Sequence, residues 1–305
     1  MIDDLLALRN VLQHAMLNLE DLINSHNKTT TIAPPPIQAM AQAELPVQLS
    51  IPDLANPDWP AAWPQSLIAN ANTDQEKTYR AIQIVAAYNE TPCLEGRKIL
   101  DLGCGDGFVA NELTKRNTNG IYAYDIAPDK AWTSFKHHDL TFLSDFDRVL
   151  ANAPYDTILL HDVIDHAPPD LLEISLRQLI DYSGKDVKLI VTAHPFPSRH
   201  GGHIHESKNL AFLHLLCSED ELANLGIRCA YNNRWSRPQA AYENMFARLN
   251  LKILHKEIDT DTVEPWVISQ LLPIIMKRIY DNNISAEQAE KILSVSWVQY
   301  ILQPG

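Results

Sequence analysis

The sequence predicts an α/β protein built on a doubly wound, mostly parallel seven-stranded sheet with helices on both faces. Two observations carry this prediction. From about residue 73 onward, short apolar segments alternate with helix-like ones, which is the pattern of a parallel sheet with covering helices. In addition, a glycine-rich turn stands directly between an apolar segment and a helix-like one, as at the ligand-binding edge of many α/β sheets.

Length, composition and net charge indicate which class of protein this is and which binding partners are unfavourable. The chain has 305 residues, of which 46% are hydrophobic and 21% charged, and its formal net charge is −13. These values are typical of a soluble globular protein with one sizeable core. No apolar run approaches the roughly 18 to 20 residues of a membrane span, and the acidic N-terminus is unlike a signal peptide. The net charge argues against a general polyanion binder, and four cysteines without a CxxC pair predict a reducing, cytoplasmic setting.

The first 72 residues are predicted to lie outside the sheet. Residues 1–26 have the pattern of a helix in which apolar residues recur at intervals of three and four, as in a coiled coil. This helix either makes the protein a homo-oligomer or packs on its own domain. Residues 27–72 contain eight prolines, which remove backbone donors and predict a linker.

Residues 73–258 are predicted to form the sheet domain. Thr73 is a plausible N-cap of the first helix, whose inner face is expected to carry Tyr79, Ile82, Val85 and Ala86. The strands are expected in RKILDL, GIYAYDI, YDTILLHDV, VKLIVTA and, as the last one, LKILHKEI. FVANELTKR and PDLLEISLRQLIDYS have helical patterns.

Residues 259–305 are predicted to be a helical extension that caps the domain or docks a partner. Pro273 is expected to interrupt its first helix. The second, ISAEQAEKILSVSWVQYILQ, opens with a capping box formed by Ser285 and Gln288.

The segment KILDLGCGDGFVANEL is the most informative one in the chain. A strand ends at Asp101, glycines follow at positions 103, 105 and 107, and a helix begins directly. Glycine lets the backbone turn tightly and approach a ligand closely, and the helix N-terminus offers free amides. Asp125 ends the next strand about twenty residues later, where a carboxylate can accept both hydroxyls of a ribose.

The spacing G-x-G-x-G after an acidic residue resembles motif I of the class I S-adenosylmethionine-dependent methyltransferases. The alternative for this loop is a Rossmann dehydrogenase, whose third glycine stands one residue later. The resemblance covers roughly residues 75 to 258 in element order. It implies that the loop lines the methionine part of S-adenosylmethionine, that Asp125 holds the ribose, and that Asp139 lies at the adenine amine. The alternative for Asp139 is an ordinary surface aspartate. The cofactor-binding candidates are Asp101, Gly103, Cys104, Gly105, Asp106, Asp125, Ile126, Asp139, Leu140 and His161.

A second candidate site lies in HDVIDH, at the end of the fourth strand-like segment. Asp165–His166 resembles an acidic-His pair of the ubiquinone-pathway O-methyltransferases, which is structural or shapes the cofactor pocket in many relatives. The segment also resembles the E-x-x-E-H of the small-RNA 3′-end 2′-O-methyltransferases, which holds a divalent metal together with a later histidine. The corresponding metal ligands here are Asp162, Asp165, His166 and His203. On a helical turn the first three share one face, and such ligands suit Mg²⁺, Mn²⁺, Fe²⁺ or Zn²⁺. Aspartate in place of glutamate shortens the reach at both positions.

Four histidines crowd the stretch HPFPSRHGGHIHES, residues 194–207, which follows the strand-like VKLIVTA. Ligands of such sheets bind beyond the carboxyl ends of the strands, so we expect this loop to roof the methyl-acceptor site close to His166. The catalytic candidates are His166, His200, His203 and His205. They act as metal ligands, as general bases, or as parts of a loop that shapes the substrate pocket.

These features predict an S-adenosylmethionine-dependent methyltransferase that acts on an oxygen or nitrogen acceptor, with assistance by a divalent metal ion as an option. The acceptor is a small molecule, an RNA or a protein. The alternative is a methyltransferase-fold binding or structural module of a larger assembly, for instance a viral one, that residues 1–26 oligomerise.

Overall fold

The structure is a computed structural model that describes residues 73–88, 94, 97–116, 118–199, 201–202, 212–217, 219–224, 238–263, 265, 267–280 and 284–305. The predicted N-terminal helix and linker lie outside these residues, as do His200, His203 and His205.

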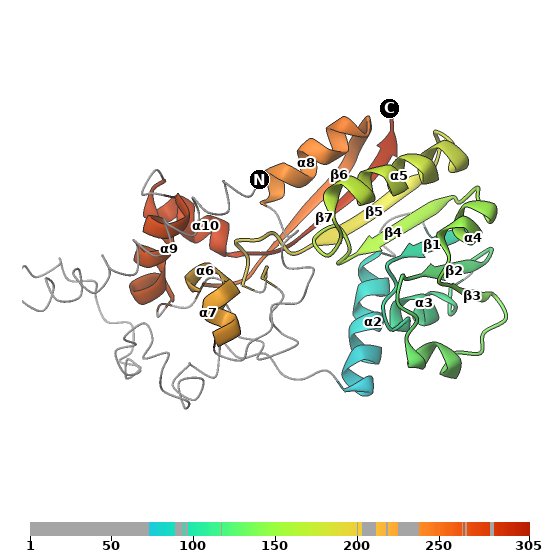
Figure 1. Cartoon of the computed structure of the whole chain (residues 1–305), viewed down its shortest axis with the longest axis horizontal. Helices are drawn as coiled ribbons and strands as arrows, with labels where there is room; N and C mark the ends of the chain where they lie inside the picture. The colour runs from blue at the N-terminus through green and yellow to red at the C-terminus, as the bar shows by residue number, and fades with distance from the viewer. Residues whose placement is uncertain are drawn as a thin grey trace, which may run out of the picture. The chain divides into compact units, whose positions relative to one another are not determined.

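A seven-stranded sheet forms the centre of the larger of two compact units (Figure 1). Its strands are β1 (Ile99–Leu102), β2 (Ile121–Tyr124), β3 (Leu140–Leu143), β4 (Thr157–His161), β5 (Lys188–Ala193), β6 (Leu251–Thr260) and β7 (Val295–Pro304). They lie in the order β3-β2-β1-β4-β5-β7-β6. β1 to β5 run parallel, and β7 is antiparallel to both of its neighbours. The predicted mostly parallel seven-stranded α/β sheet is therefore confirmed.

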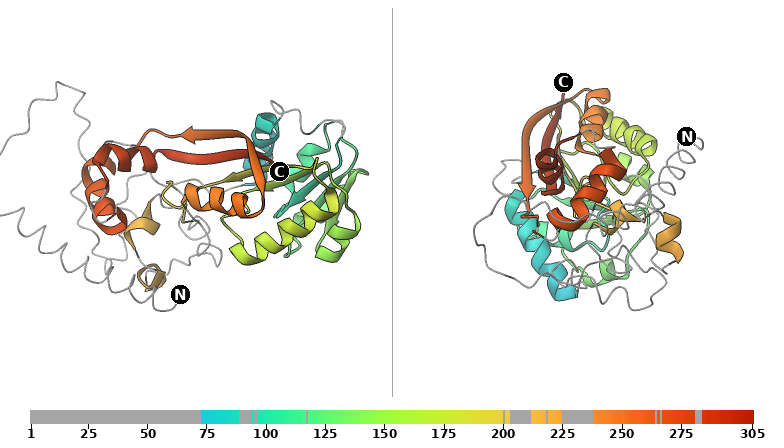
Figure 2. Two further views of the ribbon diagram at one scale, coloured as in Figure 1. Left: turned by 90° about the horizontal axis from the view of Figure 1, so that it is seen from above. Right: turned by 90° about the vertical axis from the view of Figure 1, so that its left-hand side faces the viewer.

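Helices cover both faces of the sheet (Figure 2). α2 (Asp74–Tyr88) and α3 (Phe108–Leu113) lie on one face, and α4 (Phe146–Ala151), α5 (Pro169–Ser183) and α8 (Gln239–Arg248) lie on the other. Neighbouring strand residues point to opposite faces, so Leu100 packs in the core under α5 while Ile99 packs in the core under α2. Burial on both faces explains the near-continuous apolar strands.

Two predicted helix N-termini are confirmed. The Glu76 amide donates to Thr73 Oγ1 at 3.3 Å, which caps α2. Ser285 and Gln288 form the predicted capping box at the start of α10 (Ala286–Leu293).

The inner face of α2 differs from the prediction. Ala81, Val85 and Tyr88 are buried, whereas Tyr79 and Ile82 are 63% and 41% exposed. Positions 81, 85 and 88 form one stripe at helical spacing. The larger side chains at 79 and 82 suggested another stripe, but Tyr88 also hydrogen-bonds inward and orients the helix.

The C-terminal segment, residues 259–305, was predicted to be helical, and this is wrong for residues 259–260 and 295–304. α10 ends at Leu293, and Val295–Pro304 forms β7 between β5 and β6. LKILHKEI does form a strand, β6, but at the edge of the sheet. Val298, Tyr300 and Leu302 of β7 are each 0% exposed. β-Branched and aromatic residues favour such a position, and two flanking strands satisfy its backbone.

The second compact unit contains α6 (Leu213–Leu216), α7 (Glu219–Asn224), the π-helical turn η6 (Val267–Leu271), α9 (Leu272–Tyr280) and α10. η6 gives way to α9 directly before Pro273, which agrees with the predicted interruption because proline disturbs the preceding helical hydrogen bonds. None of the described helices combines the length and the apolar character that crossing a bilayer requires.

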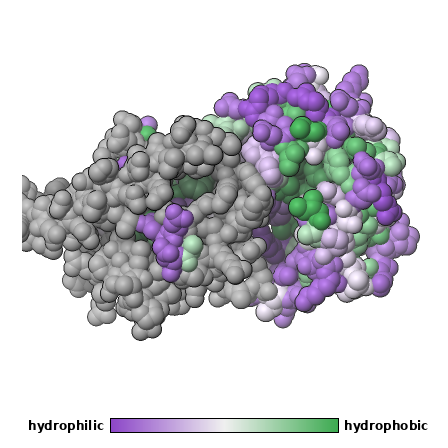
Figure 3. Space-filling view, viewed as in Figure 1, coloured by the Kyte–Doolittle hydropathy of each residue, from purple (hydrophilic) through white to green (hydrophobic). Residues whose placement is uncertain are grey.

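The surface of the sheet-containing unit is mixed. Figure 3 shows hydrophobic patches among hydrophilic side chains on one face of this unit. Its exposed apolar side chains include Leu171 and Ile174 of α5, which are 61% and 57% exposed.

Candidate functional site

The turn between β1 and α3 is an open glycine loop. Gly103, Gly105 and Gly107 have φ values of +80°, +51° and +83°, a region that side chains with a Cβ rarely adopt. Apart from its two chain neighbours, no described residue has an atom within 4 Å of a Cβ placed on Gly105. The backbone at Gly105 therefore faces open space, where a ligand can approach the chain closely.

Asp125, at the end of β2, holds this loop in place. Its Oδ2 accepts the Gly105 amide at 2.9 Å, and its Oδ1 accepts the Ala127 amide at 3.0 Å. Each carboxylate oxygen can accept a second hydrogen bond. Asp125 can therefore stabilise the loop and receive ribose hydroxyls at the same time.

Asp101 lies beneath the loop as a buried carboxylate. The residue is 2% exposed, and Oδ2 has no hydrogen-bond partner among the described residues. Burial, reinforced by the charges of Asp125 and Asp106, raises the pKa of Asp101 to about 7. A buried carboxylate oxygen without a donor is costly, so this position fits a cationic ligand. S-adenosylmethionine meets this requirement because it is positively charged at its amino group and its sulfur.

Two further loop residues were cofactor candidates. Asp106 pairs with Lys77 of α2 at 3.0 Å, which ties the loop to that helix and raises the pKa of Lys77. Cys104 is buried, and burial raises the pKa of its thiol. Its thiol is therefore uncharged and serves packing rather than nucleophilic chemistry.

The adenine-side candidates do not lie together. Ile126 follows the carboxyl end of β2 and is 82% exposed. Leu140 is the first residue of β3 and pairs with Ile121, the first residue of β2. Asp139 therefore lies at the opposite edge of the sheet from Asp125, and its predicted place at the adenine amine is wrong.

Asp139 Oδ2 lies 3.1 Å from His138 Nε2. Together with His137 they form the only group of three or more metal-type ligands, among the described residues, whose donor atoms all lie within 4.8 Å of one another. This group is exposed and is not the predicted metal site.

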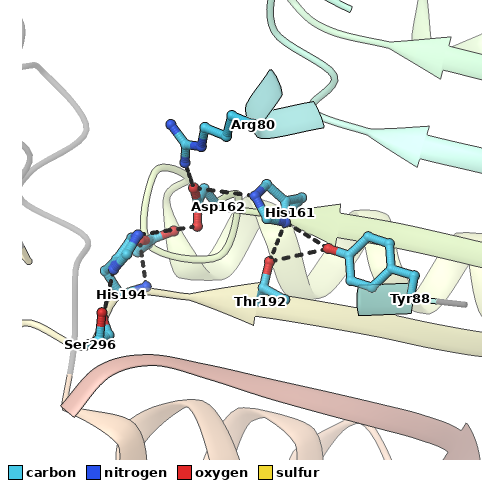
Figure 4. Close-up of polar contacts among 8 residues, drawn as sticks. Arg80, Tyr88, His161, Asp162, Thr192, His194 and Ser296 are labelled. Carbon is cyan, nitrogen blue, oxygen red and sulfur yellow. Dashed lines mark hydrogen bonds and ion pairs between the residues drawn. The ribbon is translucent and has the colours of Figure 1, made fainter. Parts of the chain in front are cut away.

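A polar cluster gathers where β4 and β5 end (Figure 4). We call it the strand-end cluster, and its members are Arg80, Tyr88, His161, Asp162, Thr192 and His194. His161 Nδ1 lies 2.6 Å from the Tyr88 hydroxyl and 2.7 Å from Thr192 Oγ1. Burial, more than any charge, lowers the pKa of His161. The imidazole is therefore neutral at neutral pH and is fixed between two hydroxyl groups.

Asp162 is the charged centre of this cluster. Its Oδ2 lies 2.7 Å from an Arg80 guanidinium nitrogen and 3.6 Å from His161 Nε2, and its Oδ1 lies 3.8 Å from His194 Nε2. Its backbone φ is +53°, a left-handed conformation that costs roughly 1 to 2 kcal/mol for a residue with a Cβ. Such strain is concentrated at functional sites.

The predicted helical turn in HDVIDH is wrong at Asp162, because a left-handed residue cannot continue a right-handed helix. Asp165 is 0% exposed, and its Oδ2 accepts the His194 amide at 3.3 Å. Burial and Asp162 raise the pKa of Asp165 to about 6. Within the described part of the chain, Asp162, Asp165 and His166 do not bring donor atoms within 4.8 Å of one another as a group. With His203 outside that part, the metal site stays a prediction.

His194 was not among the residues selected from the sequence. Its Nδ1 lies 2.7 Å from the carbonyl oxygen of Ser296 in β7. A carbonyl only accepts, so Nδ1 carries the hydrogen, and Nε2 of the neutral ring carries the lone pair facing Asp162. The available signal was positional: His194 directly follows β5, just as His161 ends β4. Tyr88 was missed because the inner face of α2 was misassigned. Arg80 lies on the exposed part of α2, and its pairing with Asp162 joins residues 82 positions apart.

Comparison with known proteins agrees with this geometry. Residues 74–256, more than half of the chain, match a family described as methyltransferase domain. A search of curated proteins found no match.

Three methyltransferases are among the similar solved structures. Magnesium protoporphyrin IX methyltransferase from Synechocystis with bound S-adenosylhomocysteine is 15% identical with a TM-score of 0.44, over 78% of this chain and 90% of that one. An S-adenosylmethionine-dependent methyltransferase from Archaeoglobus fulgidus is 14% identical with a TM-score of 0.45, over 75% and 97%. The methyltransferase domain of bacterial CtHen1-C is 12% identical with a TM-score of 0.45, over 75% and 98%. These likenesses are distant, and the family assignment rests on the sequence match. With its family shown by that match and its glycine loop built as motif I predicts, the chain belongs to the methyltransferase-domain family of S-adenosylmethionine-dependent enzymes.

Proposed function

We propose that the protein transfers the methyl group of S-adenosylmethionine to an oxygen or nitrogen atom of an acceptor that binds at the strand-end cluster. The observation that carries the cofactor part is Asp101, a buried carboxylate beneath the glycine loop with one oxygen that has no hydrogen-bond partner in the described ranges. When bound, S-adenosylmethionine supplies an electrophilic methyl group on a positively charged sulfur.

Different residues around the glycine loop bind different parts of the cofactor. Asp101 accepts the amino group, and the Gly105 backbone borders the methionine part. Asp125 keeps acceptor capacity for the ribose hydroxyls beyond its two amide bonds. Ile126, which follows the carboxyl end of β2, borders the adenine.

The acceptor site follows from the adjacency of two loops. β4 is the neighbour of β1 in the sheet, and a Cβ on Gly103 would lie 2.6 Å from a methyl carbon of Val163. The glycine loop therefore touches the turn that carries Asp162. Methyl transfer is a direct displacement, so the protein mainly has to position the two reacting groups.

A hydroxyl or amino acceptor loses a proton when it is methylated. The strand-end cluster contains basic groups that can receive this proton. In the neutral tautomer, His194 Nε2 carries a lone pair that can take this proton, and Asp162 Oδ1 lies 3.8 Å from the same nitrogen. His166, His200, His203 and His205 remain further candidates for the same task. The alternative role of this edge of the sheet is metal assistance through Asp162, Asp165, His166 and His203.

Transfer of a tritiated methyl group to pools of metabolites, RNA and protein tests the activity. We expect His194→Gln to lower the transfer rate by about 10- to 100-fold and to leave the affinity for S-adenosylmethionine unchanged. His255→Gln on the edge strand β6, with a 52% exposed side chain, is the matched control and should behave as wild type. Loss of transfer with a chelator, restored by a divalent metal, would favour the metal alternative.

Absence of both label transfer and S-adenosylmethionine binding would contradict the proposed function. A stable oligomer that binds no cofactor would instead favour the binding-module alternative. The proposed setting is the cytoplasm, supported by Cys104 and Cys217 being free thiols.

A further inference from the structure

Trp132 connects the segment after β2 to the glycine loop through one hydrogen bond. It lies in the short helix η3 (Lys130–Ser134), and its indole Nε1 donates to the Gly105 carbonyl oxygen at 2.8 Å. The amide of the same glycine donates to Asp125 at 2.9 Å. Both backbone polar groups of Gly105 are therefore held by side chains from the end of β2 and the segment behind it.

The indole is itself held firmly. The η3 helix is capped by Asp129, whose Oδ1 accepts the Ala131 amide at 2.7 Å. The Trp132 ring stacks on Phe142 of β3 with a centroid distance of 4.7 Å and an interplanar angle of 13°. The same two rings occupy the space beside Gly107, where a Cβ would lie 2.7 Å from Phe142 and 3.2 Å from Trp132. Stacking thus fixes the direction of the indole N–H.

We propose that Trp132 is a positioning residue for S-adenosylmethionine, and that its indole N–H keeps the Gly105 peptide in the orientation that receives the methionine half of the cofactor. This inference rests on the proposed function. Gly105 has a positive φ, and within the described part of the chain a Cβ there would meet nothing within 4 Å beyond its chain neighbours, so its peptide has room to rotate. Without the indole donor, part of the binding free energy is used to order the loop, which lowers affinity.

Trp132→Phe separates this role from packing, because phenylalanine keeps a ring over Phe142 and removes only the donor. The probes are S-adenosylhomocysteine and 5′-methylthioadenosine, which lacks the amino-acid part, and the measurement is calorimetry. One exposed hydrogen bond predicts a rise of about fivefold in Kd for S-adenosylhomocysteine. The Kd for 5′-methylthioadenosine should rise by less than about twofold, because that ligand does not extend over the Gly105 peptide.

Two controls accompany the measurement. Trp297→Phe on β7, at a similarly half-buried position, should leave both affinities unchanged. The unfolding midpoint of ligand-free Trp132→Phe should lie within about 4 °C of wild type, which shows that the fold is intact.

An unchanged affinity for S-adenosylhomocysteine would overturn the inference. An equal loss for both probes would also overturn it, because that loss would reflect the adenosine side or the whole domain. Wild-type protein that binds neither probe would instead reject the proposed function.

Discussion

Replacing Asp101 by asparagine is expected to stabilise the ligand-free protein and to weaken cofactor binding. The carboxylate is 2% exposed and its pKa is raised from 3.8 to about 7, mainly by burial. At 1.36 kcal/mol per pH unit, a shift of about three units corresponds to roughly 4 kcal/mol of destabilisation by the ionised group at pH 8. Asparagine removes the charge and keeps the shape, so a gain on the order of 2 to 4 kcal/mol in unfolding free energy is expected.

The same substitution removes the charged acceptor that we propose for the cofactor amino group. Hydrogen bonds to charged groups contribute about 1.5 to 3 kcal/mol. The Kd for S-adenosylmethionine should therefore rise by about 10- to 150-fold. A substitution that raises the unfolding free energy and lowers the affinity for the ligand distinguishes a buried ligand-binding carboxylate from a structural one.

The stability of the ligand-free wild-type protein and its affinity for S-adenosylmethionine depend on pH in opposite directions. The pKa of Asp101 is raised in the folded state, so its contribution to the stability of the fold is fully present below the unfolded-state pKa of 3.8. This contribution is lost as the pH rises through about 7. The stability difference between variant and wild type should therefore open from about pH 4 to pH 7 and stay constant above that. Wild-type affinity should fall as the pH drops below about 7, because Asp101 becomes protonated.

Urea denaturation at pH 5 and pH 8 measures the stability, and titration calorimetry with S-adenosylmethionine measures the affinity. Asp181→Asn on the exposed face of α5 is the matched control and should change neither quantity. An Asp101→Asn variant that is less stable than wild type at pH 8, or that binds S-adenosylmethionine equally well, would refute this account of the site.

Three further predictions follow from the loop and the N-terminus. Asp125→Ala removes the acceptor of two amides and of the ribose, so the Kd for S-adenosylmethionine should rise at least about tenfold in calorimetry; unchanged affinity would contradict the assigned role. Gly107→Ala should cost about 1 to 3 kcal/mol more in urea unfolding than Gly105→Ala, since only at Gly107 would the methyl group meet a ring, at 2.7 Å. Gly105→Ala should instead weaken cofactor binding, and equal stabilities would count against this packing. A chain that starts at Asp74 should lose the oligomerisation predicted for residues 1–26, and equal monomer masses in light scattering would reject it.

Much of the fold could be predicted because it is encoded locally. The apolar segments around Leu100 and Ile190 are buried on both faces, so each strand is recognisable without its neighbours. The Thr73 cap depends on a contact three residues away. The element order of the domain followed from such signals, as did the position of the glycine loop.

Errors occurred where local signals competed. The helix signal of Ser285 was strong, and it was extended past Leu293 into residues whose β-branched and aromatic character favours a strand. The best local stripe on α2 was not the buried one, because hydrogen bonding by Tyr88 also determines which face docks.

The sequence by itself determined the proposed cofactor half of the site. Glycines at fixed positions and an acidic residue at the end of the following strand are local backbone requirements, and each is visible one segment at a time. The tertiary structure alone decided the proposed acceptor half. Ser296 lies 102 positions from His194, and only the antiparallel register of β7 brings its carbonyl to the imidazole and selects the tautomer. The left-handed turn at Asp162 and the bond from Trp132 to Gly105 likewise depend on packing between distant segments, because hydrophobic periodicity identifies a buried face but not the partner that covers it.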